Sequence, residues 1–194
     1  MTDAARKAEY SGLVQAAAGG DRDAMERLLV RAQEAAYRFS LLVCGHPEDA
    51  EDVMQDALIK TYQHVSGITD PQSFRTWLYT TVRNACLMKR RRHAGEPAAF
   101  VSLDGDPDDE RAGAVQIPDV AIRADERLVN EWMDGRLRRA LKTLPPAYRM
   151  IVVMREIEGL STKEVAAITG YSEVNVKTRL HRARLMLRKR LEGL

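Results

Sequence analysis

Apolar residues recur every three or four positions over most of the chain, a spacing that predicts helices. In the first half, this pattern predicts a short helix ending at Gly19-Gly20, a longer one from Asp21 to about Val43, and a third from about Pro47 to Val65. A fourth is expected to begin at Asp70-Pro71, since aspartate is a good N-cap and proline suits the first turn. Alternating, strand-like runs are few, so the pattern predicts an all-α fold.

The helical pattern fails from about residue 94 to residue 121, where glycine, proline and acidic residues are frequent. Such a composition is typical of a flexible linker. The sequence therefore predicts two helical domains, residues 1–94 and 122–194, joined by a flexible acidic linker over residues 95–121. A helix from Ile122 to Lys142 is expected to open the second domain.

The last third of the chain predicts three short helices. Pro145-Pro146 suits the start of the first helix, and Gly159 suits its end. Ser161 and Glu164 have the spacing of a capping box for the second helix, which Gly170 is expected to end. Ser172 is the expected N-cap of the third helix. The stripe expected to be buried on that helix comprises Val176, Leu180, Ala183 and Leu187.

The third of these helices is strongly basic, with seven Lys or Arg and no acidic residue from Lys177 to Arg190. A helix, a tight turn and a basic second helix form the layout of a helix-turn-helix, whose second helix enters the DNA major groove. The alternative is a solvated basic face without a DNA role. The side chains expected to reach DNA are Asn175, Lys177, Thr178, His181, Arg182 and Arg184.

The predicted helix from Pro47 to Val65 has an acidic side opposite its apolar stripe. Acidic residues in a first turn also complement the helix dipole, so part of this pattern is ordinary helix chemistry. Ile59, however, is an apolar residue on the acidic side, which favours a protein contact over a solvated face. The residues expected in that contact are Asp49, Glu51, Asp52, Gln55, Asp56 and Ile59.

An uncharged polar line follows the next predicted helix through Ser73, Thr76, Thr80 and Asn84, and leads to the basic run Lys89–Arg92. Amide and hydroxyl groups bind base edges, whereas basic residues bind phosphates. The alternative is a soluble helix face with a basic last turn. We expect Trp77 to pack in the core rather than to stack on a base, because it lies in the apolar stripe.

Composition and charge narrow the function classes. The chain has 194 residues, is 45% hydrophobic and 30% charged, and carries a net charge of only +2, so the distribution of charge is more informative than its sum. Cys44 and Cys86 are expected to be buried, reduced thiols. The four histidines lack metal-ligand spacing. The absence of a signal peptide or long apolar run predicts a cytoplasmic protein.

Several of these segments resemble the extracytoplasmic-function (ECF) sigma factors of bacterial RNA polymerase. Leu144-Pro145, Gly159-Leu160-Ser161 and Val176–Arg184 match the family's promoter-reading domain, while Asp49–Asp56 resembles its acidic helix. Phe74–Tyr79 followed by Val82-Arg83-Asn84 also matches. One departure is Val174-Asn175, where family members usually have Gly-Thr.

The resemblance implies a role for each surface. The acidic helix would bind the clamp helices of the largest subunit of core RNA polymerase, and the basic helix would read the minus-thirty-five element. The linker would thread the polymerase's template and RNA-exit path, and an anti-sigma factor would hold the free protein. Capture of a flipped base of the melted minus-ten element is implied for Ile68, Thr69, Asp70, Pro71, Gln72, Ser73 and Asn84, with Thr80, Arg83, Arg90 and Arg91 beside them.

Two other functions remain open at this point. A helix-turn-helix regulator acting without being a polymerase subunit would explain the second domain but not the acidic helix. A helical anti-sigma or adaptor protein would make the basic charge of the last helix incidental. We expect no enzyme activity and no cofactor or metal, since the sequence has no nucleophile–base constellation, phosphate-binding loop or metal-ligand cluster.

Overall fold

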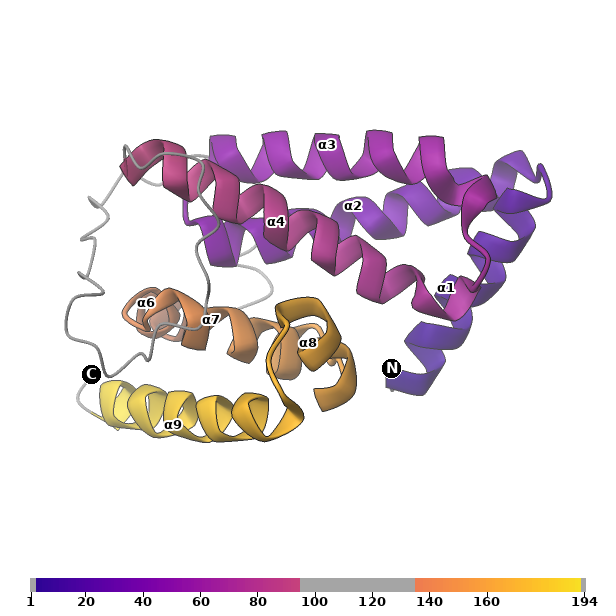
Figure 1. Ribbon diagram of the computed structural model, residues 1–194. Coiled ribbons are helices and arrows are strands. Elements are labelled where there is room, and N and C mark those ends of the chain that lie inside the picture. The colour runs from indigo at the N-terminus through magenta and orange to yellow at the C-terminus, as the bar shows by residue number, and fades with distance from the viewer. Residues whose placement is uncertain (1–2, 95–134, 193–194) are drawn as a thin grey trace.

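The computed structural model describes residues 3–94 and 135–192, and every element in these ranges is helical (Figure 1). The predicted linker 95–121 lies outside the described residues, as does most of the predicted helix from Ile122. Figure 1 shows two layers: α2, α3 and α4 form the upper one, and α6 to α9 form the lower one. The predicted all-α fold with two helical domains is confirmed.

The N-terminal domain contains the four helices that the apolar spacing predicts. They are α1 (Asp3–Ala18), α2 (Arg22–Cys44), α3 (Pro47–His64) and α4 (Phe74–Ala94). Asp21 caps α2, since its carboxylate accepts a hydrogen bond from the amide of Ala24 at 3.0 Å. Gly45 then ends α2 in the left-handed conformation, with φ of 88°, which a residue with a side chain rarely adopts.

The segment between α3 and α4 is not a plain loop. It forms two short 3-10 turns, η1 (Val65–Gly67) and η2 (Pro71–Ser73). Asp70 caps the second of these turns rather than α4 itself, by accepting a hydrogen bond from the Gln72 amide at 3.0 Å. The second turn begins at the Asp-Pro pair, where aspartate supplies the cap and proline suits the first helical position.

The C-terminal domain contains α6 (Gly135–Lys142), α7 (Pro146–Val152), α8 (Thr162–Thr169) and α9 (Glu173–Glu192). Between α7 and α8 the backbone widens into a π-helical turn, η3 (Val153–Ile157). The predicted capping box of α8 is present, and the predicted stripe of α9 is buried. Gly159 and Gly170 both have positive φ, so each ends its helix as predicted.

The two cysteines are joined, which corrects the prediction of reduced thiols. Cys44, the last residue of α2, forms a disulfide with Cys86 of α4, and their Cα atoms lie 5.5 Å apart. Both cysteines are buried, as expected. Local sequence patterns do not reveal the bond, because 42 positions separate the cysteines and they meet only when α2 and α4 pack side by side.

One apolar core runs through both domains. Its buried members include Phe39, Leu78 and Val82 from the N-terminal domain and Met154 and Leu160 from the C-terminal domain. Trp77 packs against this core, with its ring centroid 5.8 Å from that of Phe74, which agrees with its predicted packing role. The two domains therefore share buried apolar surface, and α4 contacts α8 directly.

Candidate nucleic-acid and polymerase interface

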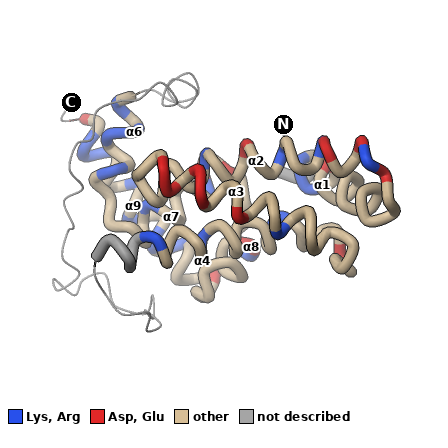
Figure 2. Tube along the Cα trace, turned by 90° about the horizontal axis from the view of Figure 1, so that it is seen from above, with Lys and Arg blue, Asp and Glu red and all other residues tan. Residues whose placement is uncertain are grey.

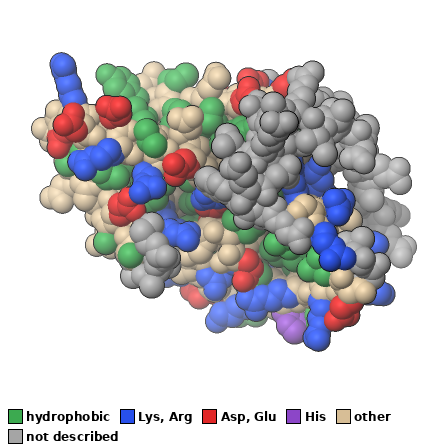
Figure 3. Space-filling model, turned by 180° about the vertical axis from the view of Figure 1, so that it is seen from behind, with side chains coloured by type: hydrophobic (Ala, Val, Ile, Leu, Met, Phe, Trp, Pro, Cys, Tyr) green, Lys and Arg blue, Asp and Glu red, His purple; other side chains and the backbone are tan. Residues whose placement is uncertain are grey.

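The basic face of α9 is the most complete of the predicted surfaces. The six residues predicted to reach DNA are all exposed. Thr178, His181 and Arg182 lie opposite the buried stripe of the helix, and Asn175, Lys177 and Arg184 flank them. Figure 3 shows a band of basic side chains along the lower edge of the molecule, where Figure 1 places α9. Ser172 accepts a hydrogen bond from the Asn175 amide at 3.2 Å, so the predicted N-cap holds the start of this helix.

Two local contacts set the geometry of the α9 face. The guanidinium of Arg179 lies 4.0 Å from the centre of the Tyr171 ring, a cation–π contact that joins α9 to the turn before it. Arg184 forms an ion pair with Glu156 at 2.6 Å. This ion pair turns one of the predicted DNA-contacting side chains toward η3. Local spacing does not predict it, because 28 positions separate the two residues.

The acidic side of α3 is largely exposed, and Figure 2 marks the positions of its Asp and Glu residues in red along the tube. Asp52, Gln55, Asp56 and Ile59 are exposed, and Glu51 is half-buried. Asp49 is different: it is buried, and its carboxylate lies 3.8 Å from the ammonium of Lys89 on α4. The expectation that Asp49 points outward is therefore wrong, because α4 packs over the first turns of α3. Lys89 also pairs with the exposed Asp52 at 2.5 Å.

The segment predicted to capture a base is exposed along most of its length. Thr69, Asp70, Gln72 and Ser73 are exposed, whereas Ile68 and Pro71 are half-buried, and Ile68 packs against the core. The Ser73 hydroxyl donates to the Asp70 carbonyl at 2.7 Å, which closes the turn on itself. The polar groups of this turn thus lie at the surface on a fixed backbone.

The polar residues along α4 lie in different surroundings. Thr80 is half-buried, and its hydroxyl donates to the Thr76 carbonyl within the helix. Asn84 is exposed, and its side-chain oxygen accepts a hydrogen bond from Arg83 at 3.2 Å. Arg83 also donates to the Ile168 carbonyl of α8 at 3.0 Å, and burial lowers the pKa of its guanidinium. The side chains of Arg90 and Arg91 lie outside the described residues.

Asn84 lines a groove between α3 and α4 with a volume of about 410 Å³. Its walls combine aromatic, apolar and charged groups: Val53, Asp56, Lys60, His64, Trp77, Thr81, Ala85, Met88 and Lys89. The structure therefore brings Asn84 close to Asp56 of the acidic face. None of the residues 68–73 lines this groove, so the turn and the groove are two separate parts of the predicted minus-ten surface.

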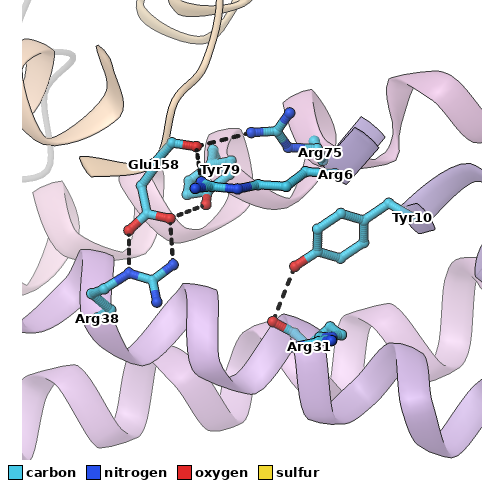
Figure 4. A network of polar contacts seen from close by, with 7 residues as sticks. All are labelled: Arg6, Tyr10, Arg31, Arg38, Arg75, Tyr79 and Glu158. Atoms are coloured by element: carbon cyan, nitrogen blue, oxygen red, sulfur yellow. Dashed lines mark hydrogen bonds and ion pairs between the residues drawn. The ribbon is translucent and has the colours of Figure 1, made fainter. Parts of the chain in front are cut away.

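Sequence reasoning missed a buried polar cluster between the domains, drawn in Figure 4. Glu158, just before Gly159, is 1% exposed. Its carboxylate accepts two hydrogen bonds from Arg38 of α2, at 2.6 and 2.7 Å, and one from the hydroxyl of Tyr79 of α4, at 2.6 Å. Its backbone carbonyl accepts from Arg6 at 2.9 Å and from the buried Arg75 at 3.0 Å.

The cluster changes the acid–base properties of its members. Burial, together with the negative charge of Glu158, raises the pKa of Tyr79 well above its ordinary value. Burial and the same charge raise the pKa of Tyr10 to about 12. For Arg38, burial acts against the charged form, but the hydrogen bonds and charge of Glu158 outweigh it, so its pKa is raised. Glu158 is thus a buried carboxylate that accepts hydrogen bonds from a charged donor, Arg38, and from a neutral donor, Tyr79.

The described ranges hold neither a cluster of metal ligands nor a helix able to span a membrane. Among residues 3–94 and 135–192, no group of three or more His, Cys, Asp or Glu side chains is placed to hold a metal ion. Within the same ranges, no helix combines the length and the apolar character that crossing a membrane requires.

Comparison with known proteins gives the family. Residues 25–96 match the model of sigma-70 region 2, and residues 134–187 match that of sigma-70 region 4. The chain is 32% identical to the ECF RNA polymerase sigma factor SigE of Mycolicibacterium smegmatis, over 93% of this chain and 67% of that protein. It is 30% identical to the ECF RNA polymerase sigma factor SigL of Mycobacterium tuberculosis, over 93% of this chain and 96% of that one.

Among solved structures, the fold resembles that of the sigma factor RpoE in its complex with the anti-sigma factor NepR, from Bartonella quintana. The TM-score is 0.61 at 22% identity, and the match covers 86% of this chain and 96% of that one. The acidic face of α3, the exposed basic face of α9 and the two matched regions agree with one another. This chain belongs to the ECF RNA polymerase sigma factor family.

Proposed function

We propose that the chain serves as a sigma subunit with three separate working surfaces: α9 for the minus-thirty-five element, α3 for core RNA polymerase, and the 68–73 turn with α4 for the minus-ten element. The observation that carries this proposal is the face of α9. Six side chains capable of binding DNA lie exposed on α9, and the stripe of four buried residues fixes which side of the helix faces outward, while Glu156 holds one of the six, Arg184.

On α9, Arg182 is assigned to base edges and Lys177 to phosphates. An arginine forms two parallel hydrogen bonds to guanine, whereas a lysine binds a phosphate as a point charge. Both side chains are exposed. Asn175 lies two residues before Lys177, near the start of the helix. The N-terminal part of a recognition helix is the part that contacts base edges in the major groove.

On α3, the polymerase contact is assigned to Asp52, Gln55, Asp56 and Ile59, with Glu51 at its edge. These residues lie on successive turns of one side of the helix. Carboxylates around an exposed apolar residue suit a basic helix of a partner protein. Asp49 is assigned to holding α4, because Lys89 lies beside it.

At the minus-ten element, the exposed polar groups of the 68–73 turn are assigned to an extruded base, and the α3–α4 groove that Asn84 lines is assigned to the strand next to it. Extrusion costs a few kcal/mol and requires polar groups aimed at the base edge. The proposed role needs no catalysis or cofactor from this chain and is performed in the cytoplasm. An anti-sigma factor is the proposed partner of the free protein.

Run-off transcription with purified core polymerase tests this function. The parent is expected to support transcripts from its own promoters, and Asp52→Lys/Asp56→Lys is expected to bind polymerase more weakly, most clearly at low salt. The matched control is Glu26→Lys/Glu34→Lys, which makes the same charge change at exposed positions of α2. If both double variants bind polymerase with equal affinity, α3 does not form the polymerase contact.

The same assay separates the alternatives. A helix-turn-helix regulator would bind promoter duplex without polymerase and would gain nothing from the core enzyme. A helical adaptor would bind no promoter DNA in either condition. Transcripts that depend on both the chain and the core enzyme contradict both.

A further inference from the structure

The contacts between the two domains are centred on Glu158. Both donors to its carboxylate, Arg38 on α2 and Tyr79 on α4, belong to the N-terminal domain, whereas Glu158 itself belongs to the helix-turn-helix (Figure 4). Arg6 and Arg75, which bind its carbonyl, also belong to the N-terminal domain. Three helices of one domain thus bind a single residue of the other.

The backbone around Glu158 presents it to these donors. The π-helical turn η3 ends at Ile157, and Gly159 follows with φ of 67°. The chain therefore reverses direction at Glu158, so its side chain and its carbonyl both reach the N-terminal domain. A π-helical turn is a rare feature that often occurs at functional sites.

A buried ion pair adds little net stability, but removing one partner is costly because the other charge is left buried without compensation. The Glu158 carboxylate and the Arg38 guanidinium therefore favour one docking arrangement over others. A hydrophobic interface of the same area would tolerate sliding, whereas a two-point guanidinium–carboxylate contact fixes both distance and angle.

The docked arrangement also occupies a residue assigned to the minus-ten element. Arg83 of α4 donates to the Ile168 carbonyl of α8, and α8 packs against α4. While this contact lasts, the Arg83 guanidinium and the side of α4 beneath α8 face protein. Asn84, one position further on, remains exposed.

We propose that Glu158 is an interdomain latch, which holds the free sigma factor in a closed form in which α8 covers part of the minus-ten surface of α4. The closed form itself is inferred from the contacts of Glu158 and Arg83. Its consequence for promoter opening rests on the function proposed for α4.

The distance between the two promoter elements requires the closed form to open. Elements centred at minus ten and minus thirty-five lie about 25 base pairs apart, or about 85 Å of duplex at 3.4 Å per base pair. A compact chain of this length has a radius of gyration of about 16 Å, hence a diameter near 40 Å. The closed form is too short to reach both elements, so Glu158 must leave Arg38 before both are bound.

Small-angle X-ray scattering and hydrogen exchange on the free, full-length protein test the latch. Glu158→Gln keeps the size of the side chain but removes its charge, and its amide donors then face the donors of Arg38 and Tyr79. We expect a larger radius of gyration and amide exchange over residues 153–165 faster by on the order of ten-fold or more. Arg38→Met is expected to act in the same direction.

The matched control is Glu156→Gln, two residues away. It breaks the ion pair with Arg184 inside the C-terminal domain, so it is expected to leave the radius of gyration unchanged. Circular dichroism verifies that each variant folds. Should Glu158→Gln lose helicity, Tyr79→Phe removes one hydroxyl from the cluster and is expected to produce a smaller shift of the same sign.

The latch is overturned if the parent is already extended, or if the folded Glu158 and Arg38 variants scatter like the parent. A separate measurement addresses the role of α4: binding of the free protein to a random-sequence single-stranded DNA pool at low salt. Tighter binding by Glu158→Gln supports the covering of α4. A change in scattering without a change in DNA binding leaves the latch standing and instead contradicts the minus-ten role assigned to Arg83.

Discussion

The raised pKa of Tyr79 predicts a loss of stability at alkaline pH. Its neutral form is favoured in the folded protein by burial and by the adjacent charge of Glu158. In the unfolded chain it ionises near pH 10. The folded state therefore holds more protons above that pH, and the free energy of unfolding falls as the pH rises. Tyr10, whose pKa is about 12, adds to the same loss between pH 10 and pH 12.

Urea unfolding at a series of alkaline pH values measures this loss. Tyr79→Phe is expected to be less stable than the parent at neutral pH but to lose less stability above pH 10. Tyr62, which is 65% exposed, supplies the control, since Tyr62→Phe should follow the parent at every pH. Parallel curves for the parent and Tyr79→Phe would mean that Glu158 does not hold the neutral phenol.

Asn84 supplies a second test at the scale of one residue. Its amide both donates and accepts, so Asn84→Ala would leave the strand proposed to lie in the α3–α4 groove, next to the extruded base, without its hydrogen-bond partners, at a cost of about 1–3 kcal/mol. We expect normal recruitment through α9 but poor opening, seen as lost permanganate reactivity of unpaired thymines. A pre-melted template should correct only that part of the opening defect which is due to strand separation. Opening equal to that of the parent would show that Asn84 belongs to an ordinary helix face.

Among the elements, α9 predicts two kinds of mutational effect. Arg182→Ala should cost about 1–3 kcal/mol of promoter affinity and relax the base preference, whereas Lys177→Ala should weaken all sequences alike and reduce the salt dependence. Both residues are exposed, so the fold should be unaffected. Binding titrations over a panel of promoter variants and salt concentrations separate the two effects. Identical specificity profiles for the parent and Arg182→Ala would exclude base reading by Arg182.

The disulfide between α2 and α4 predicts a redox-dependent stability. A disulfide that closes a loop across 42 positions lowers the conformational entropy of the unfolded chain. In the loop-entropy treatment, this adds about 4 kcal/mol to the free energy of unfolding. A thiol reductant should therefore lower the midpoint of urea unfolding for the parent but not for Cys44→Ala/Cys86→Ala. An equal response of the two proteins would show that the bond does not form in solution.

The elements also show how far sequence reasoning reached. The N-cap Asp21, the capping box of Ser161 and the buried stripe of α9 were predicted because their determinants lie within a few residues of one another. Lys89 beside Asp49, and Cys44 beside Cys86, depend instead on how α2, α3 and α4 pack, which local spacing does not encode. Glu158 was missed for the same reason, since 120 positions separate it from Arg38.

At the scale of the whole molecule, the shared apolar core predicts cooperative unfolding. Both domains contribute buried residues to one cluster, and the Glu158 contacts cross the same boundary. Differential scanning calorimetry should therefore show a single transition for the parent. Glu158→Gln should separate it into two, one for each domain, whereas Glu156→Gln should not. Two transitions in the parent would mean that the domains unfold independently.

The Arg38–Glu158 pair also links domain opening to the anions around the protein. Within the closed chain, Glu158 occupies a guanidinium fork whose geometry suits a phosphate equally well. When the domains separate, Arg38 loses the carboxylate that it binds, so the electrostatic potential around its guanidinium becomes more positive. An anion that then binds Arg38 stabilises the open form by mass action, because it has no access to that fork in the closed one. Near a promoter the most concentrated anion is the DNA backbone, so DNA competes directly with the chain's own glutamate.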